Sequence, residues 1–216
     1  MTASHHVSDE LLLAYEAGSL AEGWSLAVAT HLSFCPDCRA RARQAAALGG
    51  ALLATLDAVP LADHAFEAVL ARIGAPAPAS NGAAVRPVAS AVPAPLRDYV
   101  GADLNAVRWK RIGTAGYQAL IPTGDGQTSV RLLRIPAGQP VPEHGHRGLE
   151  LTVVLRGMLV DGQERFGVGE IEEANDELEH QPCAGAEEDC ICLAVTDAPL
   201  RFKSRLVRLV QPFLGI

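Results

Sequence analysis

The first third of the chain places apolar residues at the spacings of three and four that are typical of α-helices. Residues 8–73 are also rich in Ala and Leu and contain few β-branched residues. Pro36 suits the first turn of a helix, and Gly74 could terminate another. Gly49 and Gly50 could end or bend the third helix. The predicted helices span residues 8–17, 20–34, 36–56 and 61–74.

The segment that follows these helices has a different composition. Residues 76–96 consist mainly of Ala, Pro, Ser and Gly and offer almost nothing that could pack into a core. Such a composition predicts an extended linker. We therefore expect a helical domain of residues 1–75, a linker of residues 76–96 and a second domain of residues 97–216.

From about residue 107 the pattern changes to short segments rich in β-branched residues. Gly, Pro and Asp-Gly pairs separate these segments, and Asp161–Gly162 is a strong hairpin signal. The clearest predicted strands lie in residues 128–136, 149–157, 157–169 and 190–197. Closely spaced strands without intervening helices predict an all-β antiparallel sandwich or barrel.

Composition and charge exclude several classes of protein. Hydrophobic residues make up 49% of the 216 residues, which is enough for a real core and argues against disorder. The net charge of −7 predicts no direct binding to nucleic acid. The N-terminus lacks the basic residues of a secretory signal, and no apolar run spans a bilayer, so we expect a soluble, cytoplasmic protein without membrane contact.

His31, Cys35 and Cys38 lie at spacings that can bring one imidazole and two thiols together. His31 and Cys35 are four residues apart and share one helix face, and Cys38 follows one turn later. Zinc binds both donor types, and a structural zinc site takes four ligands. His6, just before the first helix, is the preferred fourth ligand, and His5 is the alternative. The site would be structural, because four small helices need a cross-link such as a bound metal ion to be stable.

Two other interpretations of Cys35 and Cys38 stay open. A CxxC pair can be a redox centre, although such pairs usually follow a strand in a βαβ unit and the flanks here are helical. The two thiols could also be buried small side chains without any ligand.

The order of these residues resembles the zinc-binding anti-sigma domain. The pattern of that family is one distant His followed by HxxxCxxC, and His6, His31, Cys35 and Cys38 match it. The resemblance covers residues 1–75. It implies that the domain wraps an extracytoplasmic-function-type sigma factor in a 1:1 complex and blocks its access to core RNA polymerase.

A second group of candidate metal ligands lies in the β-rich half. His144 and His146 are two residues apart, so on a strand they point to the same side. Glu150 follows four residues later, and His180 comes 30 residues after that. Three histidines and a carboxylate suit a first-row divalent metal, whereas His144 and His146 alone could be a surface pair.

Residues 138–157 resemble the first motif of the cupins, G-x5-HxH-x3-E-x6-G, with every spacing kept. The matching residues are Gly138, His144, His146, Glu150 and Gly157. The second cupin motif is met less well, because the usual proline-glycine turn before His180 is absent. The resemblance implies a small single cupin barrel that holds a divalent metal, with zinc as the expected ion.

An anti-sigma domain, an Ala/Pro linker and a cupin, in this order, resemble the ChrR-type anti-sigma factors. The resemblance covers almost the whole chain. It implies a cytoplasmic repressor, not an enzyme, that releases its sigma factor in response to singlet oxygen or related oxidative stress. The cupin half would be needed for the response and not for sigma binding. The alternatives are a metal-dependent cupin enzyme, such as a dioxygenase or isomerase, and a sensor whose signal is the cupin metal itself.

Two further features leave their roles open. Cys190 and Cys192 share a strand face, and with Cys183 they could be oxidisable thiols beside the cupin metal or ordinary buried side chains. The fourth predicted helix carries apolar residues on one face and could pack on its own domain or on a partner. These residues are Phe66, Val69, Leu70 and Ile73.

Overall fold

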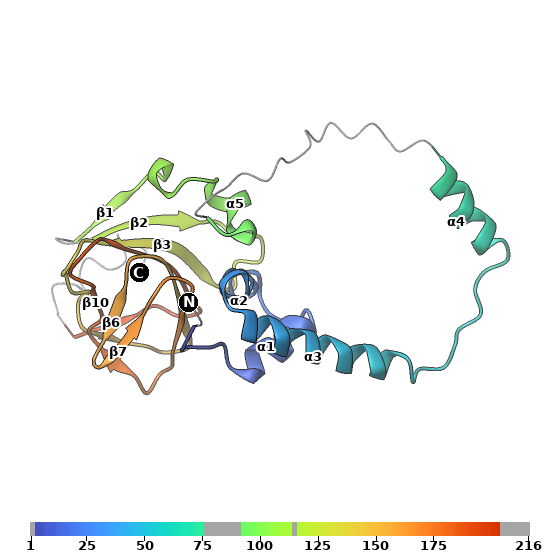
Figure 1. Ribbon diagram of the computed structural model, residues 1–216, viewed down its shortest axis with the longest axis horizontal. Coiled ribbons are helices and arrows are strands. Elements are labelled where there is room, and N and C mark those ends of the chain that lie inside the picture. The colour runs from blue at the N-terminus through green and yellow to red at the C-terminus, as the bar shows by residue number, and fades with distance from the viewer. Residues whose placement is uncertain (1–2, 76–91, 114–115, 204–216) are drawn as a thin grey trace.

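The computed structural model describes residues 3–75, 92–113 and 116–203 of the chain (Figure 1). The helices are α1 (Asp9–Glu16), α2 (Glu22–Phe34), α3 (Pro36–Leu53), α4 (Ala65–Gly74), α5 (Ala94–Val100) and the short 3-10 helix η1 (Leu104–Ala106). None of the described helices is long and apolar enough to cross a membrane. The early helices and the later strands confirm the predicted fold class, a helical part followed by a β-rich part, and the short helices α5 and η1 precede the first strand.

The strands in the described residues pair antiparallel and form three sheets. They are β1 (Lys110–Ile112), β2 (Gly116–Ile121), β3 (Ser129–Ile135), β4 (His144–Gly145), β5 (Glu150–Arg156), β6 (Leu159–Asp161), β7 (Glu164–Phe166), β8 (Ile171–Ala174), β9 (Glu179–His180), β10 (Cys183–Ala184), β11 (Cys190–Thr196) and β12 (Arg201–Phe202). The six-stranded sheet has the order β1-β2-β3-β11-β5-β8, and the small sheets have the orders β10-β6-β7 and β12-β4-β9. The hairpin predicted at Asp161–Gly162 connects β6 to β7.

The helices follow the sequence pattern closely but differ at two ends. Pro36 occupies the first turn of α3, and the Cys35 thiol accepts the N–H of Cys38 as a cap. The helix continues through Gly49 and Gly50 and ends at Leu53, three residues before the predicted end. The fourth helix begins at Ala65 and not at residue 61, because His64 before it adopts the left-handed conformation, with φ of 63°.

The linker expected at residues 76–96 is described only at its end. Residues 76–91 lie outside the described residues. Val92 and Leu96 are fully buried, and α5 begins at Ala94. The last part of the expected linker therefore belongs to the packed protein.

One face of the six-stranded sheet is apolar and packs against helices. Leu132, Leu193, Val153 and Ile171 are successive register partners across β3, β11, β5 and β8, so they share this face. All four are buried in one core cluster with residues from α1, α2 and α5. The helical and β-rich parts thus share a single core.

The opposite face of the same sheet is unusually polar for a buried surface. Arg131, Ala194, Thr152 and Glu172 form the adjacent row of register partners, and only Ala194 among them is apolar. Arg131 is 6% exposed and Glu172 is 7% exposed. Because side chains alternate along each strand, the sheet separates an apolar layer beneath the helices from a polar barrel interior.

Helix α2 approaches the sheet closely at Gly23. A Cβ atom added there would lie 2.2 Å from Thr128 Oγ1 and 2.6 Å from Val130 Cγ2. Glu22 adds polar contacts at the same place, because its carboxylate accepts from Gly124 N and the Tyr99 hydroxyl. Only glycine allows this separation between helix and sheet.

We expect Gly23→Ala to lower the free energy of unfolding by about 1–3 kcal/mol, because the added methyl group overpacks the interface between α2 and the sheet. Urea denaturation monitored by circular dichroism measures the change. Gly49→Ala is the matched control, since it lies in α3 with no atom within 4 Å of the added Cβ. That control should be neutral or stabilising by up to about 1 kcal/mol. Equal stability of the Gly23→Ala variant and the wild type would contradict the proposed close packing.

Candidate metal centres

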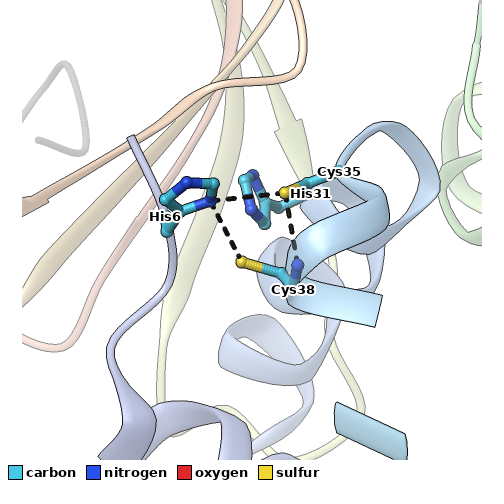
Figure 2. A group of neighbouring side chains, drawn as sticks. All are labelled: His6, His31, Cys35 and Cys38. Carbon is cyan, nitrogen blue, oxygen red and sulfur yellow. Dashed lines mark hydrogen bonds between the residues drawn. The ribbon is translucent and has the colours of Figure 1, made fainter. Parts of the chain in front are cut away.

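Figure 2 shows that His6, His31, Cys35 and Cys38 converge at one end of the helical part, and these four residues are called the Cys/His group below. Their ligand atoms all lie within 4.8 Å of one another. His6 Nδ1 lies 3.4 Å from Cys35 Sγ and 3.5 Å from Cys38 Sγ. His31 and both cysteines are fully buried, whereas His6 is exposed at the edge.

His31 is set up to donate a ring nitrogen lone pair into the Cys/His group. Its Nδ1 lies 2.8 Å from the carbonyl oxygen of Gly169, so Nδ1 carries the proton and Nε2 carries the lone pair. Nε2 is buried and has no hydrogen-bond partner among the described residues. Burial lowers the pKa of His31 to about 4, which keeps the ring neutral. A buried acceptor without a partner beside two thiols fits a metal ion that binds nitrogen and sulfur.

Arg41 supplies positive charge beside the two thiols. Burial raises the pKa of Cys38, and the neighbouring Cys35 acts in the same direction. The guanidinium Nη1 of Arg41 lies 3.8 Å from Cys38 Sγ and also donates to the carbonyl oxygen of Val7. An ion pair with Asp9 holds this side chain in place. Two thiolates would be favoured by the cation, as ligation of a metal requires.

The structure distinguishes between the two candidate histidines of the N-terminal arm, which is the segment of residues 3–8 before α1. His6 belongs to the Cys/His group, while His5 does not. The His5 ring packs against Phe166 at a centroid distance of 4.2 Å and lies 3.1 Å from a Glu164 carboxylate oxygen. His5 therefore faces the β-rich part.

His144, His146 and His180 form a second cluster in the barrel interior, called the histidine group below. His144 and His180 are register partners on β4 and β9. The Nε2 atom of His180 lies 3.0 Å from that of His146 and 3.1 Å from that of His144. All three rings are at most 7% exposed. This arrangement brings together two predicted ligands in and directly after β4 with a third on β9, 34 residues after His146.

Hydrogen bonds within the histidine group cannot satisfy the Nε2 atoms of all three rings. A single proton on His180 Nε2 can form a well-aligned hydrogen bond with Nε2 of His144 or with Nε2 of His146, but not with both. Burial lowers the pKa of His144 and of His146 to about 4, so both of these rings are neutral. A divalent cation that displaced this proton would bind the Nε2 lone pairs of all three rings at once, and three imidazoles are a common ligand set for such ions.

Two carboxylates that the sequence analysis missed orient His180. Asp161 Oδ2 lies 2.8 Å and Glu172 Oε1 lies 3.6 Å from His180 Nδ1. Burial would lower the pKa of His180, but these carboxylates raise it to about 9. When a carboxylate accepts a hydrogen bond from Nδ1 of a histidine, it fixes the ring so that Nε2 points toward the metal, as in many metal centres. The polar residues of the stretch GEIEEA, in an otherwise buried strand, were the available signal for Glu172.

Glu150 lies beside the histidine group but outside it. Its Oε2 atom is 3.5 Å from Nδ1 of His146, the ring nitrogen that faces away from the other histidines. The same oxygen is buried without a hydrogen-bond partner among the described residues, while Oε1 accepts from Thr152. Burial raises the pKa of Glu150 to about 7. Glu150, the predicted carboxylate ligand, thus lies next to the histidine group but is not part of it.

The thiols of β11 face the barrel interior. Cys190 belongs to the small apolar cluster on that side of the sheet, and Cys192 lies two residues further along β11. A hydrogen bond with Cys190 and burial raise the pKa of Cys192 well above its usual value. Cys183 is half-buried on β10. Thiolates are the reactive form, so burial makes Cys192 a slow nucleophile.

We expect Glu150→Gln to stabilise the chelator-treated protein at pH 8 by up to about 3 kcal/mol and to change nothing at pH 4. The folded-state pKa of about 7 lies above the ordinary value of 4.5, so stability falls as pH rises through this interval. The glutamine removes that fall. Urea denaturation at several pH values measures the effect, with the exposed Glu187→Gln as control. A pH-independent difference between variant and wild type would contradict the buried carboxylic acid.

Known proteins resemble this chain in both of its parts. The family model described as the ChrR cupin-like domain matches residues 98–199. A protein named anti-sigma-E factor ChrR, from Cereibacter sphaeroides, is 54% identical over 220 residues, and the alignment covers 100% of both proteins.

A solved structure gives the same result in three dimensions. The crystal structure of Rhodobacter sphaeroides SigE in complex with the anti-sigma ChrR matches with a TM-score of 0.79 and 50% sequence identity. The match covers 91% of this chain and 100% of that chain. Since the similarity extends over the helical part and the β-rich part together, this chain belongs to the ChrR family of anti-sigma factors, in which a helical domain precedes a cupin-like domain.

Proposed function

We propose that this protein is an anti-sigma factor that binds an extracytoplasmic-function-type sigma factor and keeps it from core RNA polymerase. The full-length relationship to a protein named anti-sigma-E factor supports this function, as does the similarity to a SigE–ChrR complex. The proposed complex is 1:1 and cytoplasmic, where RNA polymerase acts. Exclusion is competitive, because the anti-sigma factor covers surface that the polymerase would bind.

The observation that carries this proposal is an apolar helix without a partner. Helix α4 has 10 residues, none of them buried, and it lies apart from the other described elements (Figure 1). Phe66 is 68% exposed and Ile73 is 75% exposed, and Val69 and Leu70 share their face. Isolated helices shorter than about 12–15 residues are marginal in water, so α4 needs a binding partner to be stable.

The segment before α4 extends the apolar surface. The end of α3 and the chain after it expose large hydrophobic side chains that contact no core. They are Leu48, Leu52, Leu53, Leu56, Val59 and Leu61. Exposed apolar surface of this extent is typical of protein interaction sites, and an amphipathic helix in a groove of the partner is a common mode of recognition.

We assign a structural zinc ion to the Cys/His group. Two thiols and two imidazoles are a zinc ligand set, and the orphaned Nε2 of His31 supports a bound cation. The ion would tie the N-terminal arm to α2 and α3 and supply stability that three short helices lack. His6 would be its exposed ligand and His31, Cys35 and Cys38 its buried ligands.

We assign the signal input to the barrel, with singlet oxygen or a related oxidant as the signal. The histidine group would hold a divalent metal, with zinc as the expected ion and Glu150 as a fourth ligand after a small movement of its side chain. Cys190 and Cys192 share the interior with three imidazoles, so oxidation of any of these side chains would change the surroundings of the metal, although burial slows the reaction of the thiols. No enzymatic activity is proposed, since the relative that spans both domains is named as a regulator.

We expect Val69→Asp combined with Ile73→Asp to weaken binding of the sigma factor at least about tenfold, or about 1.4 kcal/mol. Both side chains are exposed in the free protein, so its melting temperature should not change. Calorimetric titration with the sigma factor that co-purifies with the full chain measures the affinity. Ala71→Asp is the matched control, because at 100° per residue it lies on the opposite side of α4. Equal weakening by the control would exclude the apolar face as the binding surface.

We expect His146→Ala to abolish induction of a sigma-dependent reporter by an illuminated photosensitiser while the complex with the sigma factor still forms. The histidine group loses a ligand in this variant, whereas α4 and the Cys/His group stay intact. A parallel strain with Cys190→Ser and Cys192→Ser tests the thiols separately. Loss of induction in this strain alone would make the thiols the sensor. Normal induction in both strains would refute the barrel as the signal input.

A further inference from the structure

The turn between β7 and β8, residues 167–170, contacts both His31 of the Cys/His group and the N-terminal arm that carries His6. It reaches His31 from one side and the N-terminal arm from the other. The strand that leaves this turn, β8, runs to the histidine group. The turn therefore lies between the two candidate metal centres.

Gly169 positions His31. Its carbonyl oxygen accepts the Nδ1 proton at 2.8 Å, which directs the Nε2 lone pair toward the two thiols. The backbone of Gly169 has φ of +88°, and an added Cβ would lie 2.4 Å from Cβ of Phe34 at the end of α2. Since no other residue fits here without a shift, the turn is pressed against the helix that carries His31.

Glu170 positions the arm that carries His6. Its Oε1 atom accepts from Ser4 N at 2.5 Å, from Ser4 Oγ at 2.7 Å and from His5 N at 3.3 Å. Its Oε2 atom accepts from Gly167 N at 2.7 Å, which holds the carboxylate in place. These donors directly precede His6, the exposed ligand. On the other side of His6, Val7 is buried and Ser8 N donates to Glu173 Oε1 at 2.7 Å, so β8 and the turn before it hold the arm at both ends.

The same turn is bonded rigidly to the barrel. Gly169 N donates to the carbonyl oxygen of Val154 at 2.8 Å, and Val154 N donates to that of Glu170 at 3.0 Å, which joins the turn to β5. Two residues beyond Glu170, Glu172 lies 3.6 Å from His180 Nδ1. A displacement of β8 at the histidine group therefore moves the turn at the Cys/His group.

We propose that the turn 167–170 is the positioning element of the Cys/His group and couples metal binding there to the state of the histidine group in the barrel. The inference rests on the proposed function, in which both groups hold a metal ion. A metal at the histidine group stabilises β8 and the turn, and these hold His31 and the arm in the geometry for ligation. By linkage, each site then raises the affinity of the other.

Release of Co²⁺ from the full-length protein tests the proposal. Cobalt bound to cysteine thiolates shows a near-ultraviolet charge-transfer band that a site of histidines and a carboxylate lacks, so the band reports the Cys/His group alone. Transfer of Co²⁺ to excess chelator follows its loss. We expect Glu170→Gln to speed this release about tenfold and His146→Ala to speed it about fivefold.

Two further variants separate positioning from a general loosening of the protein. Ser4→Ala removes one hydrogen bond to Glu170 at an exposed residue that cannot unfold the chain, and it should speed release about threefold. Asp125→Asn removes a carboxylate that accepts from Glu22 N at 2.5 Å, which is an equivalent contact between the helical and β-rich parts remote from the turn. This control should release Co²⁺ at the wild-type rate.

Each outcome decides a separate point. Wild-type release from both Glu170→Gln and Ser4→Ala, or equal acceleration by Asp125→Asn, would overturn the positioning role of the turn. Acceleration by Glu170→Gln with wild-type release from His146→Ala would overturn the coupling between the sites. A wild-type protein without the charge-transfer band would instead refute the metal site in the proposed function.

Discussion

The packing of α2 against the apolar face of the six-stranded sheet is the contact on which the other features depend. Gly23 allows the helix to come within van der Waals distance of Thr128 and Val130, and the core beneath is shared by both parts of the chain. Because strand side chains alternate, an apolar row under the helix requires that the adjacent row point into the barrel. That second row carries Arg131, Thr152 and Glu172, so one physical constraint produces both the hydrophobic core and the polar interior.

The two candidate metal centres lie on opposite sides of this sheet and have different chemistry. The Cys/His group offers four donors, among them a buried imidazole nitrogen, Nε2 of His31, that has no hydrogen-bond partner among the described residues, as suits a structural ion. The histidine group offers three imidazoles in a polar interior with Glu150 beside them but outside the group, so its ligand set is less complete. This contrast matches the proposed division between a stable sigma-binding part and a barrel that responds to a signal.

Helix α4 is the element that the rest of the structure does not explain. Every other described helix contributes buried side chains, whereas α4 contributes none and exposes an apolar face. A folding chain gains nothing by leaving such a face in water unless a partner covers it. The free protein is thus organised as a packed body with an unpartnered binding helix, which fits the membership of the chain in an anti-sigma family.

The sequence by itself determined whatever depends on spacing along one element. The spacings of His31 and Cys35 and of His144 and His146 predicted that each pair would lie close together, although Cys35 directly follows α2 and His146 directly follows β4. The change from helical to strand period separates the helical part from the β-rich part. The ends of α3 and α4 were less predictable, because His64 takes a left-handed conformation that no local pattern demands.

Only the tertiary structure decided which distant groups meet these residues. His6 rather than His5 joins Cys35 and Cys38, since Phe166 and Glu164 hold the His5 ring elsewhere. Gly169 meets His31 across 138 positions of the chain, and Asp161 meets His180 from a neighbouring strand pair. Hydrogen bonds and burial between such remote residues depend on how sheets and helices pack, and no periodicity along the chain encodes that packing.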